Sequence, residues 1–224
     1  FMAVFYVVLC GFILWSHASE LPEAIRLVIT SAFSPSAASG GFVGATVMMA
    51  IRSGIARGIF SNESGLGSAP IAAAAAKTRW SAEQGLVSMT GTFIDTLVIC
   101  SMTGLMLVVT GAWKSNSVGA GMTQLAAGSV FPTWGPLLLT IGLVLFAFTT
   151  ILGWNYYGER CMEYLVGIKG IIPYRVIFIG LVAAGPFLKL DMIWVLADIV
   201  NGLMAFPNLI ALLALSGVVV DETK

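Results

Sequence analysis

The chain has 224 residues, of which 58% are hydrophobic and 10% are charged, and it carries no net charge at neutral pH. Its mean hydropathy is +0.95. Soluble domains are typically about 45–50% apolar and about 25% charged, so this composition argues against a water-soluble fold. With no excess of basic residues we expect no nucleic-acid partner, and the expected surroundings of the chain are the lipid bilayer.

The first two predicted elements are an incomplete span and a surface helix. Residues 1–15 are apolar but slightly short for a membrane crossing, which needs about 20 residues. Because the chain begins at Phe1 inside this stretch, we interpret it as a fragment and expect upstream residues to complete the span. Residues 19–30 combine charged residues with apolar ones at helical spacing, which predicts an amphipathic helix at the membrane surface.

Residues 40–78 are the stretch around which the rest of the chain is organised. Their small apolar flanks favour helix, whereas Gly65, Gly67 and Pro70 do not. We therefore predict a broken helix at about 40–78, with an unwound polar segment at 60–68. In a membrane such a break is tolerated only where it faces protein or a water-filled cavity, and many secondary transporters bind ions and zwitterions at such breaks.

The polar residues of this break are the first candidate binding site. A zwitterionic amino acid needs donors for its carboxylate and acceptors for its ammonium, which helix ends and hydroxyls supply. The alternative is that these side chains only cap the helix beginning near Ser68, although a cap needs a single such residue. The candidate substrate-binding residues of the break are Phe60, Ser61, Asn62, Glu63, Ser64, Gly65 and Gly67.

Residues 84–110 form a strong span with Asp95 near its centre. Charges at bilayer depth are costly, so such a residue is a functional candidate. Asp95 could lie on an ion path or pair with Arg52 or Arg57, and the sequence does not choose between these. The two arginines could instead sit near the interface with their charged ends in water.

After a polar, glycine-rich stretch with a short helix at 122–127, residues 134–157 form the next span. A hydroxyl of Thr149 or Thr150 could bind Na⁺, since hard cations prefer oxygen ligands. The alternative is ordinary hydrogen bonding of threonine to the preceding turn. Trp154 shares a helix face with Thr150 and could wall the substrate pocket, or it could be a tryptophan of the interfacial belt.

The rest of the chain predicts a polar connection over 159–169, a span ending near residue 188, and apolar stretches at 192–204 and 208–220. Proline kinks or breaks a helix, so the last two stretches are either one kinked span or two short ones. In total we expect five or six crossings after the first. Asp198 and Asn201, three residues apart on one face, form a polar patch that could act as a gate.

No catalytic constellation is visible, so we expect the chain not to be an enzyme and to need no cofactor. The single histidine, His17, has no partner in sequence, and Gly65 and Gly67 are not followed by the lysine of a phosphate loop. The cysteines have no metal-binding spacing. They are Cys10, Cys100 and Cys161.

The run ARGIFSNESGLGSAPI at 56–71 closely resembles the alanine or glycine:cation symporter family, the sodium:alanine symporters. The resemblance covers essentially the whole chain. At Ser64 family members usually carry alanine, and at Ala73 they usually carry histidine, so no role of that histidine transfers to this sequence. Supporting motifs are Lys77-Thr78, FIDT at 93–96, TTILGW at 149–154, ADIVNGLM at 197–204 and PNLIALL at 207–213.

The resemblance implies an all-α, polytopic integral membrane protein with the LeuT-type inverted-repeat transporter fold. Residues 1–224 would be the C-terminal part of the transmembrane domain, namely the last helix of the first repeat and the second repeat. The N-terminal half would be missing here. LeuT-type transporters carry a hydroxyl pair at a sodium site on the equivalent helix, which strengthens the ion-binding interpretation of Thr149 and Thr150.

The function implied is Na⁺-coupled symport of a small neutral amino acid, alanine or glycine, by alternating access in the inner (plasma) membrane. Na⁺ is then the coupling ion, with H⁺ as the alternative. Two other functions stay open, a LeuT-type transporter of another small solute and a channel or structural subunit. The preferred amino acid, its stereochemistry and the oligomeric state are not determined by the sequence.

Overall fold

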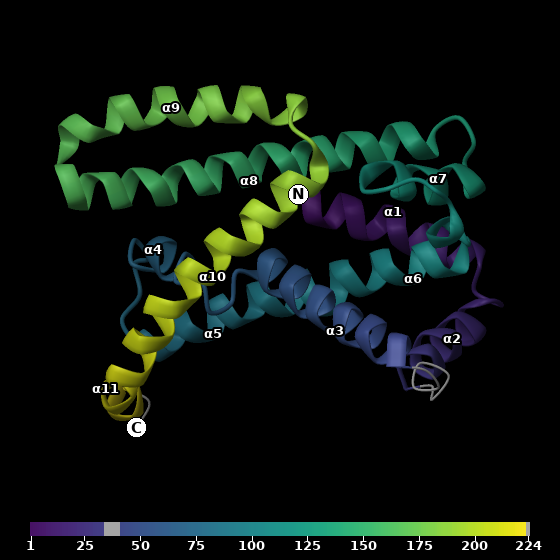
Figure 1. The fold of residues 1–224 in the computed structure, drawn as a ribbon, viewed down its shortest axis with the longest axis horizontal. Helices are drawn as coiled ribbons and strands as arrows, with labels where there is room; N and C mark the ends of the chain where they lie inside the picture. The colour runs from purple at the N-terminus through teal and green to yellow at the C-terminus, as the bar shows by residue number, and fades with distance from the viewer. Residues whose placement is uncertain (34–40, 223–224) are drawn as a thin grey trace. The chain divides into compact units, whose positions relative to one another are not determined.

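A computed structural model describes residues 1–33 and 41–222 (Figure 1). The described chain is 84% helical and contains no strand, which confirms the predicted all-α class. The longer helices are α1 (Met2–Ser16), α2 (Leu21–Phe33), α3 (Gly41–Asn62), α5 (Ser81–Thr92), α6 (Ser101–Val109), α7 (Ala120–Val130), α8 (Gly135–Val166), α9 (Ile171–Ala184) and α10 (Leu190–Ala214). The shorter ones are α4 (Ala69–Ala73), the π-helix η2 (Phe93–Cys100), the 3₁₀ turns η3 (Ala112–Lys114), η4 (Ile168–Gly170) and η5 (Gly185–Phe187), and α11 (Ser216–Glu222).

Four helical segments of the described chain are long and apolar enough to cross a membrane. They are Ser81–Val109, Gly135–Val166, Ile168–Phe187 and Leu190–Ala214. A fifth crossing is reached only if Met2–Ser16 and Leu21–Ser31, bent by 101°, count as one span. The chain is therefore a polytopic membrane protein, and the expected total of five or six crossings after the first stays a prediction.

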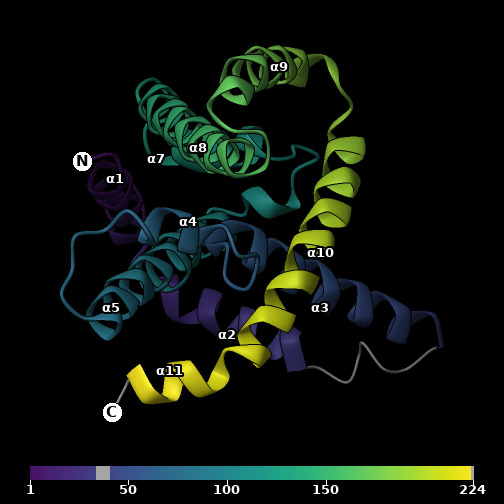
Figure 2. The same ribbon diagram turned by 90° about the vertical axis from the view of Figure 1, so that its left-hand side faces the viewer.

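The structure decides between the two alternatives for the last apolar stretches. The stretches 192–204 and 208–220 do not form two spans, because α10 continues through Pro207 as far as Ala214 (Figure 2). Helix α3 has 22 residues and carries Arg52 and Arg57, and α4 has five residues. Residue 40, the predicted start of that stretch, lies outside the described residues.

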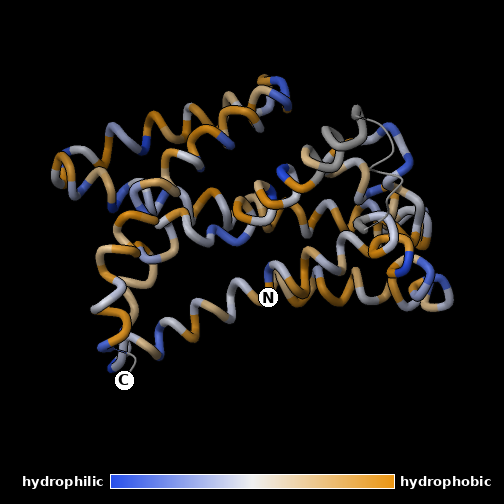
Figure 3. The backbone as a smooth tube through the Cα atoms, turned by 60° about the horizontal axis from the view of Figure 1, so that its bottom comes forward, coloured by the Kyte–Doolittle hydropathy of each residue, from blue (hydrophilic) through white to orange (hydrophobic). Residues whose placement is uncertain are grey.

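Most apolar side chains of the long helices are exposed rather than packed inside the protein. Figure 3 shows apolar residues along the length of the helices, with hydrophilic residues mainly at turns and ends. On α10, Leu196, Leu203 and Leu209 are all more than half exposed. Lipid tails are as apolar as leucine, so such surfaces are stable in a bilayer, whereas they would aggregate in water.

The described residues form two compact units. Unit 1 comprises residues 1–55 and 93–149, and unit 2 comprises residues 56–92 and 150–224. The chain passes from one to the other within α3, between α5 and η2, and within α8.

Unit 1 has a small, tightly packed core. Ala126 and Ala127 of α7 are fully buried, and small residues allow helices to approach closely. The hydroxyl groups of Tyr6 and Thr103 are hydrogen-bonded at 2.9 Å and join α1 to α6. The Tyr6 ring also meets Phe146 of α8 edge to face at 5.4 Å. The core side chains are Tyr6, Leu9, Cys10, Ile13, Met106, Ala112, Ala126, Ala127 and Leu139.

Candidate functional site

The helix break predicted between α3 and α4 is present in unit 2. Helix α3 ends at Asn62 and α4 begins at Ala69, so the predicted unwound segment is confirmed for residues 63–68, whereas residues 60–62 are still helical. Three residues between them have left-handed backbone, with φ of 55° at Glu63, 82° at Gly65 and 81° at Gly67. Glu63 is the only non-glycine residue of the described chain with positive φ, a conformation that costs a side-chain-bearing residue roughly 1–2 kcal/mol.

Local hydrogen bonds stabilise this strained segment, here called the break (residues 63–68). The backbone N–H of Glu63 donates to the carbonyl of Ile59 at 2.9 Å, which ends α3 in a left-handed cap. The backbone N–H of Ser64 donates to Oδ1 of Asn62 at 2.9 Å, and the Ser68 hydroxyl donates to Oε2 of Glu63 at 2.7 Å.

These contacts bear on the alternative that the polar residues only cap α4. Helix α4 has no side-chain capping hydrogen bond. The side chains of Asn62 and Glu63 instead hold the break itself, and Ser68, which is 1% exposed, is bound to Glu63. Whether these residues also bind a substrate stays a prediction.

The break borders a cavity of about 530 Å³ within unit 2. Of the predicted site residues, Gly67 and Trp154 line it, although they lie on separate elements. The Trp154 ring is half-buried and meets Tyr157 edge to face at 5.8 Å. The cavity is lined by Leu66, Gly67, Ser68, Ile71, Trp154, Tyr157, Gly158, Cys161, Tyr174, Phe178, Met204, Pro207 and Asn208.

The cavity has the character of a site for a small molecule. Sites of this kind usually enclose about 300–1,000 Å³, with apolar and aromatic walls and a few polar groups. Here four aromatic residues, Trp154, Tyr157, Tyr174 and Phe178, line the cavity, while the glycine-containing break and the Asn208 side chain supply polar groups. This arrangement can hold a ligand with a polar end toward the break and an apolar end toward Trp154.

Phe60, the first of the candidate residues, belongs to a different cluster. Its ring meets Trp194 of α10 at 5.5 Å, and the guanidinium of Arg57 lies 4.0 Å from the centre of the same indole. Nη2 of Arg57 donates to Oδ2 of Asp198 at 2.8 Å. Arg57 and Asp198 thus pair with each other, which favours the partnered over the interfacial interpretation of Arg57. Asn201 is half-buried one turn further along α10.

The two threonines proposed for sodium differ in their contacts. The hydroxyl of Thr149 donates to the carbonyls of Leu145 and Phe146, at 3.1 and 2.9 Å, which is the ordinary back-bonding weighed above. Thr150 is exposed and does not line the cavity of unit 2. Their role in ion binding stays a prediction.

Asp95 lies in an unusual backbone. The predicted span over 84–110 is helical, but residues Phe93–Cys100 form a π-helix, and Asp95 lies in its first turn. Such π-helical segments are rare in proteins, and those that occur are often found at functional sites. The Thr96 hydroxyl lies 3.5 Å from Oδ2 of Asp95. A functional role for Asp95 stays a prediction.

The predicted polar connection over 159–169 is mostly helical, because α8 continues to Val166 and the 3₁₀ turn η4 follows. Figure 1 shows α9 returning along the C-terminal part of α8. Glu159 is buried there, 5% exposed, and binds Arg175 of α9 through two hydrogen bonds, one of them 2.9 Å from Nη2 to Oε2. Nδ2 of Asn155 donates to Oε1 of Glu159 at 2.6 Å. The spacing of Asn155 and Glu159, one helical turn apart, could have suggested this cluster.

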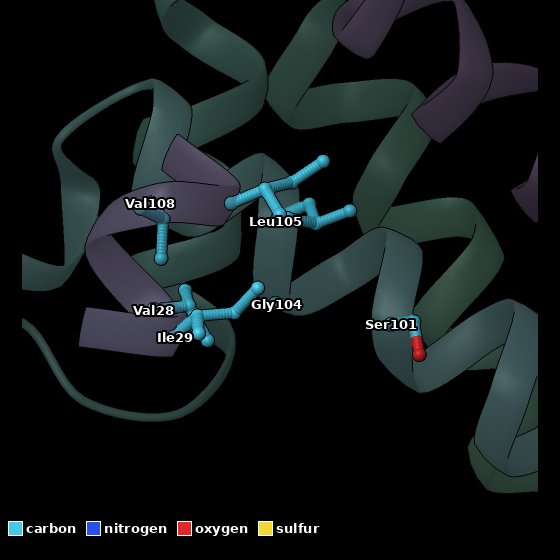
Figure 4. Close-up of a pocket in the computed structure, with 7 residues that line it drawn as sticks. Val28, Ile29, Ser101, Gly104, Leu105 and Val108 are labelled. Carbon is cyan, nitrogen blue, oxygen red and sulfur yellow. The ribbon is translucent and has the colours of Figure 1, made fainter. Parts of the chain in front are cut away.

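A second cavity lies in unit 1, between α2 and α6 (Figure 4). It encloses about 410 Å³, and its walls are apolar except for Ser101. None of the predicted site residues lines it. It is lined by Ile25, Val28, Ile29, Ser101, Gly104, Leu105 and Val108.

The described residues contain no group of three or more His, Cys, Asp or Glu side chains that could hold a metal ion. The cysteines Cys10, Cys100 and Cys161 form no disulfide. Nδ1 of His17 lies 3.2 Å from the carbonyl of Ile13, at the end of α1. These side chains form no catalytic group with one another.

Several membrane-length helices, an interrupted helix and a cavity beside the interruption define a polytopic helical membrane protein with a candidate small-molecule site. The whole chain, residues 1–224, matches the sodium:alanine symporter family, and it belongs to that family. This confirms the family resemblance noted at 56–71. The family consists of transporters, which confirms that the chain is not an enzyme.

Three relatives illustrate the range of names in the family. The chain is 59% identical over its full length to an uncharacterized transporter of Haemophilus influenzae, covering 50% of that protein. It is 49% identical to the sodium/alanine symporter AgcS of Methanococcus maripaludis, covering 100% of the chain and 49% of the relative. It is 37% identical to the probable sodium/glutamine symporter GlnT of Bacillus subtilis, covering 100% and 46%. The chain spans about half the length of these relatives.

Proposed function

We propose that the full-length protein is a Na⁺-coupled symporter of a small neutral amino acid, alanine or glycine, working by alternating access in the plasma membrane. The observation that carries the proposal is the position of the break, whose Gly67 and Ser68 line the same cavity as Trp154. Membership of the sodium:alanine symporter family and the name of the AgcS relative support the ion and the substrate class.

The proposed fold is the LeuT-type inverted repeat, with this chain supplying the last helix of the first repeat and the second repeat. A helix interrupted by left-handed residues frees backbone N–H and C=O groups, which can bind the carboxylate and ammonium of an amino acid. Na⁺ and substrate stabilise the same closed state, so each raises the affinity for the other. Thr149 and Thr150 are the proposed sodium ligands.

A second candidate substrate is glutamine. One relative is named a probable sodium/glutamine symporter, and a cavity of about 530 Å³ has room for a side chain longer than that of alanine. The aromatic wall that includes Trp154 would then contact the longer side chain. The two candidates differ only in substrate size and share the coupling mechanism.

The test is uptake of labelled amino acids into vesicles containing the full-length protein. We expect uptake of alanine or glycine above the electrochemical equilibrium only when an inward Na⁺ gradient is imposed. A pH gradient without Na⁺ tests H⁺ coupling, and glutamine, amines and nucleobases as competitors define the substrate class. Flux that is independent of any ion gradient and too fast for a carrier would instead indicate a channel and contradict the proposal.

A further inference from the structure

The side chain of Asn208 on α10 contacts the break at two of its three left-handed positions, Gly65 and Gly67. Its Nδ2 donates to the backbone carbonyl of Gly65 at 3.0 Å. A Cβ atom placed on Gly67 would lie only 3.1 Å from Oδ1 of Asn208 and 3.2 Å from its Cγ. The amide therefore lies close against the backbone of the break, and Gly65 is 143 positions away from it in sequence.

The break needs such a partner because its backbone groups have left the helix. At membrane depth a carbonyl without a hydrogen-bond partner is costly, and Gly65 itself has no side chain that could help. Gly67 is constrained twice, by φ of 81° and by the nearness of Asn208. Any other residue at Gly67 would be strained and would also push the amide away.

Asn208 also lines the cavity, next to Pro207. Proline cannot donate a backbone hydrogen bond, so α10 is weakened one residue before the contact and can bend there more easily than elsewhere. A bend of α10 at this point moves the amide, and the amide is bound to the break. The position of α10 and the conformation of the break are thus linked through one side chain.

We infer that Asn208 is a positioning residue that holds the carbonyl of Gly65, so that α10 fixes the backbone conformation of the break beside the cavity. The inference rests on the proposed function for its effect on transport, since the break is the proposed binding segment. The contact itself is independent of that function and can be measured separately.

The experiment measures hydrogen exchange of the peptide that contains the break, in the purified full-length protein. Asn208→Leu removes both hydrogen-bonding atoms and keeps the number and branching of the heavy side-chain atoms. We expect break amides to exchange about fivefold faster than in the wild type, the equivalent of one neutral hydrogen bond of ~1 kcal/mol. Asn116→Asp, at an exposed position in the loop before α7, serves as the control for an added charge.

Asn208→Asp gives a readout that loss of packing alone would not produce. A carboxylate cannot donate to the Gly65 carbonyl, whereas the protonated acid can. Relative to the wild type at each pH, exchange should be fast at high pH and slow toward the wild-type rate as the pH is lowered. Exchange that stays at the wild-type rate in Asn208→Leu, or that is independent of pH in Asn208→Asp, overturns the inference.

Uptake by the same variants separates the two proposals. We expect the KM for alanine to rise in Asn208→Leu, with a smaller change in maximal rate. In Asn208→Asp we expect the KM for alanine to decrease as the pH is lowered. If the wild type shows no Na⁺-dependent uptake, the proposed function fails while the exchange data still decide the contact. If exchange changes but the KM does not, the positioning role in transport is refuted.

Discussion

The cluster around Glu159 makes the sharpest prediction about stability, because its two charged partners are buried to different degrees. The side chain of Glu159 is 7% exposed, whereas that of Arg175 is 55% exposed. After Arg175→Gln the carboxylate stays buried with only the Asn155 amide and a neutral replacement as partners. After Glu159→Gln the guanidinium can turn to water.

The expected magnitudes follow from this asymmetry. Removing one partner of a buried ion pair typically costs about 3–5 kcal/mol, and the half-exposed arginine places Arg175→Gln near the lower end, at about 3 kcal/mol. Glu159→Gln should cost only about 1 kcal/mol, the value of an ordinary hydrogen bond. The double variant should be close to Glu159→Gln alone, because without the carboxylate little is lost by removing the arginine.

The assay is equilibrium unfolding of the full-length protein in mixed micelles, analysed as a double-mutant cycle. We expect a coupling free energy of about 2–3 kcal/mol between the two positions. The matched control is Arg160 with Glu163, an ion pair on the same helix at 2.6 Å whose side chains are 45% and 36% exposed. Exposed pairs contribute about 0–1 kcal/mol, so Arg160→Gln should have a small effect.

Two results would refute the reasoning. If Arg175→Gln and Arg160→Gln reduce the free energy of unfolding equally, burial does not govern the strength of these pairs. If Glu159→Gln is as damaging as Arg175→Gln, the cost does not arise from leaving the carboxylate without its cation.

Three further predictions concern the site. Trp154→Ala should shift the ratio of leucine to alanine uptake at least tenfold, because each additional methylene of the substrate that fits into the enlarged pocket contributes about 1–3 kcal/mol of binding free energy. Trp134 lies outside the cavity, so Trp134→Ala should leave the ratio unchanged. An unchanged ratio in both variants would show that Trp154 does not line the substrate pocket. Thr150→Val should lower the apparent Na⁺ affinity more than the maximal uptake rate, and an unchanged Na⁺ dependence would speak against a sodium ligand. Gly67→Ala should reduce the free energy of unfolding by about 1–3 kcal/mol through its left-handed backbone and a clash with α10, whereas Gly180→Ala, with open space around it, should be neutral or stabilising. Equal effects of the two glycine substitutions would contradict that reasoning.

Local and compositional features could be predicted from the sequence. The apolar composition indicates membrane helices, because a span needs about 20 apolar residues whatever its neighbours are. The break is predicted by Gly65, Gly67 and Pro70, because left-handed backbone and a missing N–H are properties of single residues. The run at 56–71 is likewise sufficient to indicate the symporter family.

Contacts between elements could not be predicted, because they depend on how helices pack and on distances that no local pattern encodes. Glu159 looks like part of a polar loop until α8 is seen to continue beneath Arg175. Phe60 carries the same local signal as its neighbours but points to Trp194, in a cluster with Arg57. Pro207 left one kinked span and two short spans as alternatives, and α10 continues through it because a helix can tolerate one lost hydrogen bond when the flanking turns are intact.

The sequence by itself therefore determined the class, the family and the place of the break, since these follow from hydropathy and from the backbone preferences of individual residues. Only the tertiary structure decided which side chains border the cavity and which support the break. Asn208 shows the reason most clearly. Its hydrogen bond to Gly65 joins residues 143 apart, and such a pair is defined only once α10 lies against the break.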